Sequence, residues 1–515
     1  MSTGITLCMI VKNEARFIDA CLGSVKSILD QIIIVDTGST DGTLDLIRPF
    51  DPLVIHYEWR NDFAQARNVG LERARTPWIM MMDADERIAS RDLPLIVEAT
   101  KRDATGFEFL WRNYGYNATI ASWHTNTGEY EEGAGYPGYS QSPMFRLYRN
   151  HPLLRYEGVV HEHITWKSFP GVRVEPVPAV IHHYGRALSA KRMQEKGELY
   201  LALGYQKIEQ FPDKWEPYYE IGIQLQDFDQ CAESIPYLEK GLTLATEPNI
   251  KGLLNFYLAA AFKRLNLLDK ALGCLDQAID FRYECSSLRL LLANVYSAQG
   301  ELTKASTQYR RALQLEPANP LALLNYGLLL RDTGDLKRAE TTFMDAIKAN
   351  PSFTLPAIEL AALHSSSNRL EEAIELLEGV LKQDAESKRA RQGLAKLFIQ
   401  LSRPDDALRV LQQSQDDPVS DTLRGAAHLD RGEFDLARSI LENVLKKDRT
   451  SVGARVNLAK AYAGLGDFSK ATRHLTVAFQ QTRDPSLLEM AKAFPRQADS
   501  STQSGAESVL TYTQP

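Results

Sequence analysis

The N-terminal part of the chain alternates short apolar runs with segments whose apolar residues recur at helical spacing. The runs are uniformly apolar, which is typical of strands buried on both faces. The predicted strands cover residues 5–11, 31–36, 53–57 and 77–82. The predicted helices cover residues 14–29, a segment through Leu44 and Ile47 capped by Ser39 or Thr40, and residues 63–73. This alternation predicts an α/β domain with a doubly wound, mainly parallel sheet.

Polar residues follow three of these strands directly. They are Lys12-Asn13-Glu14, Asp36-Thr37 and Asp83-Ala84-Asp85. The carboxyl ends of parallel strands meet at one edge, where open α/β sheets bind nucleotides. Asp83 and Asp85 leave the fourth strand two residues apart, so both carboxylates can face one hard cation and the phosphates that it neutralises. The sequence therefore predicts a phosphate site with a metal ion.

Composition excludes several other classes of protein. No Gly-x-Gly-x-x-Gly or Gly-Lys-Ser/Thr loop is present, which argues against a dinucleotide oxidoreductase and a kinase-like ATPase. A formal net charge of -7 gives no electrostatic footprint for nucleic acid. No apolar run approaches the roughly 18 residues of a membrane span. The N-terminus lacks the charged region and long apolar core of a signal peptide, so we expect a cytoplasmic protein. The five scattered cysteines are interpreted as thiols of a reducing compartment.

Four motifs carry a resemblance to a known family. They are residues 5–14 (ITLCMIVKNE), 34–43 (IVDTGSTDGT), 59–68 (WRNDFAQARN) and 78–86 (WIMMMDADE). In this order they resemble the signatures of family 2 glycosyltransferases, in particular the bacterial branch fused to TPR repeats. That branch includes the sublancin-type peptide S-glycosyltransferases and the lipopolysaccharide core transferases. The resemblance covers residues 5–185 and implies a GT-A (Rossmann-like) fold, a nucleotide-sugar donor, usually a UDP-sugar, and inversion at the anomeric carbon.

The same resemblance implies roles for individual residues. The positions implied to bind the nucleotide-sugar are Val11, Asn13, Glu14, Asp36, Arg67, Asn68, Asp83 and Ala84. Among them, Asp83 would hold the ribose, while Arg67 and Asn68 would lie at the nucleotide edge. Asp85 would bind Mn2+ or Mg2+ at the pyrophosphate. Many members of the family have two carboxylates where this chain has Asp36-Thr37. This chain therefore lacks the second Asp that would recognise the nucleobase of the donor.

Residues further along the chain are candidates for the acceptor side. The stretch 112–140 is rich in aromatic residues and glycine, and we interpret it either as an acceptor-side loop or as a structural insertion. Residues 156–163 and 182–185 again resemble the sublancin-type branch. The resemblance favours Glu162 as the general base, alone or with His161, and leaves Glu157 as the alternative.

Histidines occur in two motifs, at residues 161–163 and at residues 182–183, and each is a candidate ligand site. His161-Glu162-His163 lacks the i, i+4 histidines of a helical zinc protease motif. On a strand, His161 and His163 would share one face, so all three residues can meet one ligand only if the chain turns. The resemblance favours His183 over His182 as a ligand of the metal or of a phosphate. A structural, hydrogen-bonded role is the alternative for each histidine.

From residue 191 onward the pattern is helical and repeats. Alanines mark the period of 34 residues, with one interval of 30, at Ala271, Ala305, Ala339, Ala373, Ala407, Ala437 and Ala471. The positions around them resemble the TPR consensus, in about eight copies including one before Ala271. We therefore predict three parts: a transferase domain over 1–190, an all-α TPR superhelix over 191–495, and a disordered tail over 496–515.

The function hypothesis is a metal-dependent inverting glycosyltransferase that moves a sugar to a peptide or protein held on the concave face of the repeats. One alternative is a lipopolysaccharide or other glycan acceptor. Another is a TPR scaffold with an inactive transferase domain, and the repeats can also serve only to stabilise the enzyme or to form a homo-oligomer. The sequence identifies neither the sugar nor the nucleotide, nor whether Ser, Thr, Cys or a glycan accepts the sugar.

Overall fold

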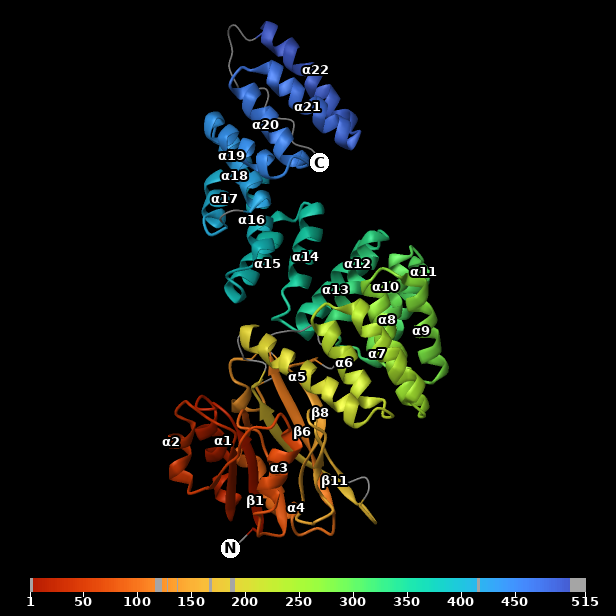
Figure 1. Cartoon of the computed structure of the whole chain (residues 1–515). Helices are drawn as coiled ribbons and strands as arrows, with labels where there is room; N and C mark the ends of the chain where they lie inside the picture. The colour runs from red at the N-terminus through yellow and green to blue at the C-terminus, as the bar shows by residue number, and fades with distance from the viewer. Residues whose placement is uncertain are drawn as a thin grey trace. The chain divides into compact units, whose positions relative to one another are not determined.

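The computed structural model describes residues 3–115, 123–126, 128–136, 138–165, 169–185, 190–414 and 417–500 (Figure 1). The chain divides into two compact units, which are described separately. The first contains Met1–Thr333 with Asp345–Phe353, and the second contains Gly334–Met344 with Thr354–Pro515. The predicted site residues therefore all belong to the first unit.

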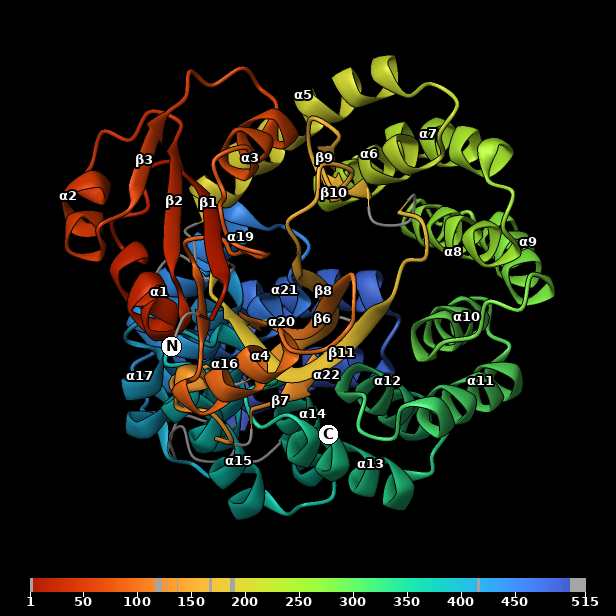
Figure 2. The ribbon, with the colours of Figure 1, turned by 90° about the horizontal axis from the view of Figure 1, so that it is seen from below.

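A mixed nine-stranded sheet forms the centre of the N-terminal part, in the order β3-β2-β1-β4-β8-β6-β11-β5 with β7 on β8. The strands are β1 (Ile5–Val11), β2 (Gln31–Asp36), β3 (Leu53–His56), β4 (Trp78–Met81), β5 (Glu86–Ile88), β6 (Gly106–Gly115), β7 (Trp123–Thr125), β8 (Gly138–Arg149) and β11 (Val174–His183). Strands β1 to β4 are parallel, as predicted. Figure 2 shows β1, β2 and β3 side by side.

Beyond β4 the prediction of a mainly parallel sheet is wrong. Strand β8 runs antiparallel to both β4 and β6, and β5 runs antiparallel to β11. Strand β8 follows β6 and β7 in the described chain without an intervening α-helix, and it runs back along its neighbours. Strand β11 comes after a longer connection and is again parallel to β6. A separate two-stranded hairpin joins β9 (Tyr156–Glu157) to β10 (His163–Ile164).

Short helices cover this sheet. They are α1 (Ile18–Val25), α2 (Thr43–Ile47), α3 (Phe63–Leu71) and α4 (Leu93–Ala99), with single 3-10 turns at Lys26–Ile28, Arg48–Phe50, Ser90–Asp92 and Glu131–Gly133. The predicted cap of α2 at Ser39 or Thr40 is wrong. The helix begins after Gly42, and the Asp41 carboxylate accepts a hydrogen bond from Thr43 N at 2.9 Å. An aspartate two residues before a free amide is a common alternative to a Ser/Thr cap.

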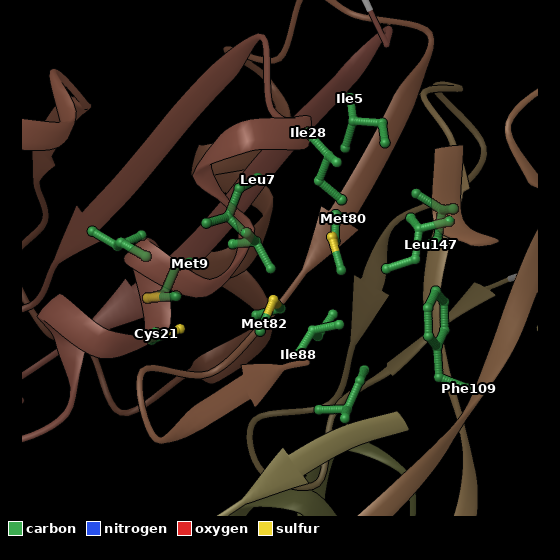
Figure 3. Close-up of a cluster of buried hydrophobic side chains, with 14 of the residues drawn as sticks. Ile5, Leu7, Met9, Cys21, Ile28, Met80, Met82, Ile88, Phe109 and Leu147 are labelled. Carbon is green, nitrogen blue, oxygen red and sulfur yellow. The ribbon is translucent and has the colours of Figure 1, made fainter. Parts of the chain in front are cut away.

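Strand β1 is buried on both faces, which explains its uninterrupted apolar sequence. On one face Ile5, Leu7 and Met9 pack with Met80 and Met82 in the cluster shown in Figure 3. On the other face Cys8 belongs to a second cluster that contains the side chains of β2, β4 and β8. All five cysteines are free thiols, as expected.

The rest of the described chain is helical, as predicted. Its helices are α5 (Ala190–Gln210), α6 (Glu216–Asp227), α7 (Cys231–Leu244), α8 (Pro248–Arg264), α9 (Leu268–Asp280), α10 (Ser286–Ala298), α11 (Leu302–Leu315), α12 (Pro320–Asp332), α13 (Leu336–Ala349), α14 (Leu355–Ser366), α15 (Leu370–Gln383), α16 (Lys388–Gln400), α17 (Pro404–Leu411), α18 (Pro418–Asp430), α19 (Phe434–Lys447), α20 (Val452–Gly464), α21 (Phe468–Thr482) and α22 (Pro485–Ser500). Each of the seven period-marking alanines is 0% exposed. Their small side chains let neighbouring helices approach closely.

Successive helices pair within each unit. In the first unit α6 contacts α7, α8 contacts α9, and α10 contacts α11; in the second, the pairs are α14 with α15, α16 with α17, α18 with α19, and α20 with α21. Within the described residues, no helix combines the length and the apolar composition that a bilayer crossing needs. Helix α22 continues to Ser500, past the predicted start of the tail, and residues 501–515 lie outside the described chain.

Candidate functional site

The loops after β1 and β2 are tied to each other at the carboxyl edge of the parallel strands. Asn13 adopts a left-handed conformation (φ 58°), and its Oδ1 accepts a hydrogen bond from Thr40 N at 2.8 Å. The carbonyl of Val11 accepts hydrogen bonds from both the amide and the hydroxyl of Thr37. Glu14 N donates to Thr43 Oγ1 at 2.8 Å. These contacts bring three of the residues predicted for the nucleoside pocket to one place.

Asp36 lies at the end of β2 and is 4% exposed. Its Oδ1 accepts a hydrogen bond from Ser39 N at 3.0 Å, and its Oδ2 lies 3.4 Å from His56 Nδ1. The carboxylate therefore shapes the loop after β2, next to Asn13. A role in binding the donor stays a prediction for this residue.

Asp83 lies between two buried arginines. Its Oδ1 accepts a hydrogen bond from Arg67 Nη2 at 2.9 Å, and its Oδ2 accepts one from Arg146 Nη2 at 3.1 Å. Desolvation alone would raise its pKa, but the two guanidinium groups hold the pKa of Asp83 well below its usual range. The side chain is one third exposed, so this ionised carboxylate still faces the edge of the sheet. The predicted contact with a ribose must compete with both arginines.

Glu86, which directly follows the two aspartates, is 0% exposed. It accepts hydrogen bonds from Trp111 Nε1 at 2.8 Å, from Arg146 Nη2 at 2.7 Å and from Asp83 N at 2.9 Å. Burial raises the pKa of Glu86, and the charge of Arg146 opposes that shift. The buried glutamate thus fixes the turn that carries Asp83 and Asp85.

Asp85 and His183 meet across the junction of β5 and β11, where His183 pairs with Glu86 in the sheet. The Asp85 Oδ2 atom lies 3.3 Å from His183 Nε2. On the other side of the ring, His183 Nδ1 lies 3.0 Å from Asn113 Oδ1, and the ring centroid lies 4.5 Å from that of Trp111. Asn113 Oδ1 can accept a hydrogen bond from Nδ1, and in that tautomer the Nε2 lone pair is available to a metal ion that lies between the ring and Asp85.

Gly185 keeps the space in front of these two atoms open. A Cβ at this position would lie 2.7 Å from both Asp85 Oδ2 and His183 Nε2. Around the described residues, no point is surrounded by three or more His, Cys, Asp or Glu side chains that could hold a metal. A Mg2+- or Mn2+-type ion held by two protein ligands takes its remaining ligands from phosphates and water. The residues present therefore fit a cation that binds together with a diphosphate.

The chain turns at His161 (φ 46°), which is the condition for the His-Glu-His motif to reach one site. Glu162 then points inwards, and its Oε1 lies 2.5 Å from Arg67 Nε. His163 instead pairs with Glu157 in the β9–β10 hairpin, and both are exposed. The structure therefore brings Glu162 to the Arg67–Asp83 pair and separates His163 from it.

Asn68 and His182 make contacts that stabilise the fold, and the role of Asn68 at the nucleotide edge stays a prediction. The Asn68 amide exchanges two hydrogen bonds of 2.9 Å with the backbone of Tyr156, which holds β9 against α3. His182 is 0% exposed, and its Nδ1 lies 2.8 Å from the Tyr114 hydroxyl. Burial, together with the charges of Arg112 and Arg91, lowers the pKa of His182 to about 3, so this histidine is neutral.

The aromatic stretch 112–140 is only partly described. Tyr114 packs with Tyr136, Tyr139 and Tyr184, so this part of the stretch is a structural cluster. Residues 116–122, 127 and 137 lie outside the described chain. The interpretation of the stretch as an acceptor-side loop stays a prediction.

Sequence reasoning missed four residues of the site. They are Glu86, Trp111, Asn113 and Arg146. Two signals were available: Glu86 extends the acidic run, and Arg146 interrupts the short apolar run from Met144 to Tyr148. A charged residue inside a buried strand needs a partner of opposite charge.

Comparison with known proteins gives independent matches for both parts. The profile described as glycosyl transferase family 2 matches residues 6–175, and tetratricopeptide repeat profiles match residues 293–334, 321–353, 365–423 and 428–493. A TPR repeat-containing protein of Synechococcus elongatus is 28% identical over 406 residues, which covers 67% of this chain and 92% of that protein.

Several relatives carry the name glycosyltransferase, and SunS and LpsC are two of them. The prophage-derived glycosyltransferase SunS of Bacillus subtilis is 29% identical over 242 residues, covering 46% of this chain and 53% of SunS. The lipopolysaccharide core biosynthesis glycosyltransferase LpsC of Rhizobium meliloti is 34% identical over 120 residues, covering 22% of this chain and 44% of LpsC. The matched region spans about half the length of each of these two relatives.

Proposed function

We propose that this chain, which matches glycosyl transferase family 2 over residues 6–175 and TPR profiles in its helical part, transfers a sugar from a UDP-sugar to a side chain of a peptide or protein. The transfer inverts the anomeric carbon and depends on Mn2+ or Mg2+. The observation that carries this proposal is the pair of Asp85 Oδ2 and His183 Nε2, 3.3 Å apart, with the side-chain space at Gly185 open in front of them.

Asp85 and His183 are the residues that would hold the divalent cation. When bound, such a cation neutralises the charge of the departing nucleoside diphosphate. Asp36 and Asn13 lie at the same edge of the sheet, and the role proposed for them is to contact the nucleoside. The carboxylate of Glu86 accepts a hydrogen bond from Asp83 N, which closes the turn that carries Asp85, and the backbone of Glu86 pairs with that of His183. Glu86 thereby keeps Asp85 next to His183.

In the transfer step, the bond between the anomeric carbon and the diphosphate oxygen breaks while the acceptor atom bonds to the opposite face of that carbon. The acceptor proton passes to a base, for which we propose His161 and Glu162. Partial desolvation beside α5 and the charge of Lys207 lower the pKa of His161, so its ring is neutral near pH 7 and can take a proton. Arg67 orients Glu162 through one carboxylate oxygen. Glu157, exposed on β9, is the alternative base.

The repeats are the proposed binding surface for the peptide or protein acceptor. Stacked TPR helix pairs form extended concave surfaces that bind polypeptides. The similarity to LpsC favours a second candidate, in which the acceptor is a lipopolysaccharide or another glycan.

The first experiment is a thermal-shift assay with UDP-, GDP- and dTDP-sugars, with and without Mn2+. The wild-type protein, Asp85→Ala and the control Asp45→Ala are compared; Asp45 is an exposed aspartate of the same domain. A donor at a hundredfold excess over its Kd stabilises the protein by about 2.7 kcal/mol. We expect a metal-dependent shift with UDP-sugars in wild type and Asp45→Ala, and none in Asp85→Ala. The absence of a shift with every donor would leave the scaffold as the better hypothesis.

A second experiment separates the two acceptor classes. The protein is incubated with the donor that it binds, Mn2+, and either a peptide library containing Ser, Thr and Cys or a lipopolysaccharide core oligosaccharide. Mass spectrometry then detects a hexose-sized mass increase. Modification of peptides supports the proposed acceptor, and modification of the glycan alone favours the second candidate.

A further inference from the structure

A buried ion pair lies next to the loop that carries His161 and Glu162. Lys207 of α5 is 3% exposed, and its ammonium group contacts both oxygens of Glu220 of α6 at 2.8 and 2.9 Å. The same ammonium donates hydrogen bonds to the carbonyl oxygens of Val160 at 2.9 Å and His161 at 3.4 Å. Helix α5, which lies outside the family 2 match, thus binds the backbone of the candidate catalytic loop through Lys207.

One face of α5 covers this loop. Tyr200, Leu203 and Lys207 lie three and four residues apart, so they share that face. Leu203 is 1% exposed in a cluster with Val159 and Val160. The ring of Tyr200 lies edge-to-face on His161, with centroids 5.1 Å apart.

The loop passes close to Lys207 from Gly158 onward. Gly158 has a φ of 99°, a conformation that glycine adopts without strain. A Cβ at Gly158 would lie 3.4 Å from Lys207 Cε. From this point the chain passes Lys207 and reaches Glu162, whose carboxylate meets Arg67 at 2.5 Å.

Stability alone does not explain the pair. Removing two charges from water is costly, and apolar residues of similar volume in place of a buried ion pair are often neutral or stabilising. The pair does something that apolar residues cannot do, because an ammonium group directs hydrogen bonds to two carbonyl oxygens at once. The pair therefore acts on the loop whose carbonyl oxygens it binds.

We propose that Lys207, oriented by Glu220, is a positioning residue that fixes the loop 158–162 so that His161 and Glu162 are placed for proton transfer. The first helices after the family 2 domain then complete the transferase site. This inference rests on the proposed function, in which these two residues form the base. The donor side, at Asp85 and His183, does not depend on it.

The test compares Lys207→Met, Glu220→Leu and the double variant in the full chain. Each single variant leaves one buried charge without its partner, so we expect lower thermal stability from both. The double variant removes both charges and regains most of that stability, but it cannot hold the two carbonyl oxygens. A purely structural pair and a positioning pair therefore differ in the double variant.

Three quantities are measured: the Kd of the UDP-sugar with Mn2+, the turnover number for transfer or for slow hydrolysis of that donor, and hydrogen exchange of the peptide covering residues 158–165. In the double variant we expect a donor Kd within about twofold of wild type, turnover reduced about tenfold or more, and faster exchange in that peptide. The control is Leu292→Ala, in the core of α10. It should lower thermal stability while turnover and exchange of this peptide stay as in wild type.

The inference is overturned if the double variant recovers wild-type turnover along with its stability. It is also overturned if hydrogen exchange of the peptide 158–165 is unchanged. If the wild-type chain neither binds nor hydrolyses any donor, the proposed function fails; the exchange measurement still decides whether Lys207 holds the loop.

Discussion

The transferase domain and the repeat helices differ in the buried residues that characterise them: charged side chains in the domain and small alanines in the repeats. In the repeats, the seven period-marking alanines are all 0% exposed, and the same local packing recurs every 34 residues in most of the array. In the transferase domain, the buried residues that stand out are charged: Arg67, Glu86 and Arg146. Their partners lie far away in sequence, 95 positions from Arg67 to Glu162 and 60 from Arg146 to Glu86.

This difference shows what kind of change each part tolerates. A repeat depends on its neighbours, so a local substitution has a local cost. The charged cluster joins α3, the β4–β5 turn, β8 and the loop before β10, so the loss of one member leaves several buried charges unbalanced.

The largest expected effect is that of Arg146→Met. It leaves Asp83 with one arginine and leaves the fully buried Glu86 without a cation. We expect a loss of about 3–5 kcal/mol in the free energy of unfolding, measured by urea denaturation. The control, Arg102→Met, removes a more exposed arginine paired with Glu175 and should cost less than about 1 kcal/mol. Similar losses from both variants would contradict the special role of the cluster.

Overpacking one repeat should have an effect of intermediate size. Ala305→Leu adds three carbon atoms at a fully buried position. We expect a loss of about 1–3 kcal/mol in the free energy of unfolding, measured by thermal or urea denaturation. Ala298→Leu, at an exposed position of α10, is the matched control and should change stability by less than about 0.5 kcal/mol. Both variants should bind the donor as the wild-type protein does. If a variant loses the thermal shift caused by the donor, a substitution in one repeat also affects the transferase domain.

The pH dependence of stability tests a buried histidine of the transferase domain. The pKa of His182 is about 3 in the folded protein and about 6.5 when unfolded, so the unfolded chain binds more protons between these values. Neutral His182 therefore does not reduce the free energy of unfolding above pH 6.5, and the free energy of unfolding falls as the pH decreases from 6.5 towards 3. Between pH 6.5 and 5 the loss is about 2 kcal/mol.

The check is urea unfolding of wild type and His182→Gln over that pH range. The variant should show a flatter dependence, while the control His124→Gln, at an exposed histidine of β7, should keep the wild-type slope. An unchanged slope in His182→Gln would mean that other groups set the acid sensitivity.

The smallest effects are expected at two glycines of the repeats. Gly273 lies inside α9, and a Cβ added there would have no atom within 4 Å, so Gly273→Ala should stabilise by about 0.5–1 kcal/mol. Gly300 also has open space but a φ of 79°, so Gly300→Ala should destabilise by about 1 kcal/mol. Equal shifts in melting temperature for both variants would contradict this distinction.

Much of the fold could be predicted from the sequence because its determinants are periodic or local. The four parallel strands follow from uninterrupted apolar runs, and the repeats follow from alanines spaced by 34 residues. The acidic strand end at Asp83 and Asp85 could be identified because a buried apolar strand that ends in two carboxylates is typical of the ligand-binding edge of an α/β sheet. The strands and the acidic strand end are visible in short windows of the chain, and the repeats are visible from their period.

The tertiary structure decided the rest. The antiparallel half of the sheet brings His183 to Asp85 and Arg146 to Glu86, and the turn at His161 separates His163 from Glu162. Lys207 reaches the candidate catalytic loop from a helix that sequence analysis assigned to the repeats alone. Apart from the turn at His161, which is local, each of these contacts joins residues 46 or more positions apart, and no short window of sequence specifies such a pair. Only the packing of the sheet and of α5 fixes which buried charge meets which partner.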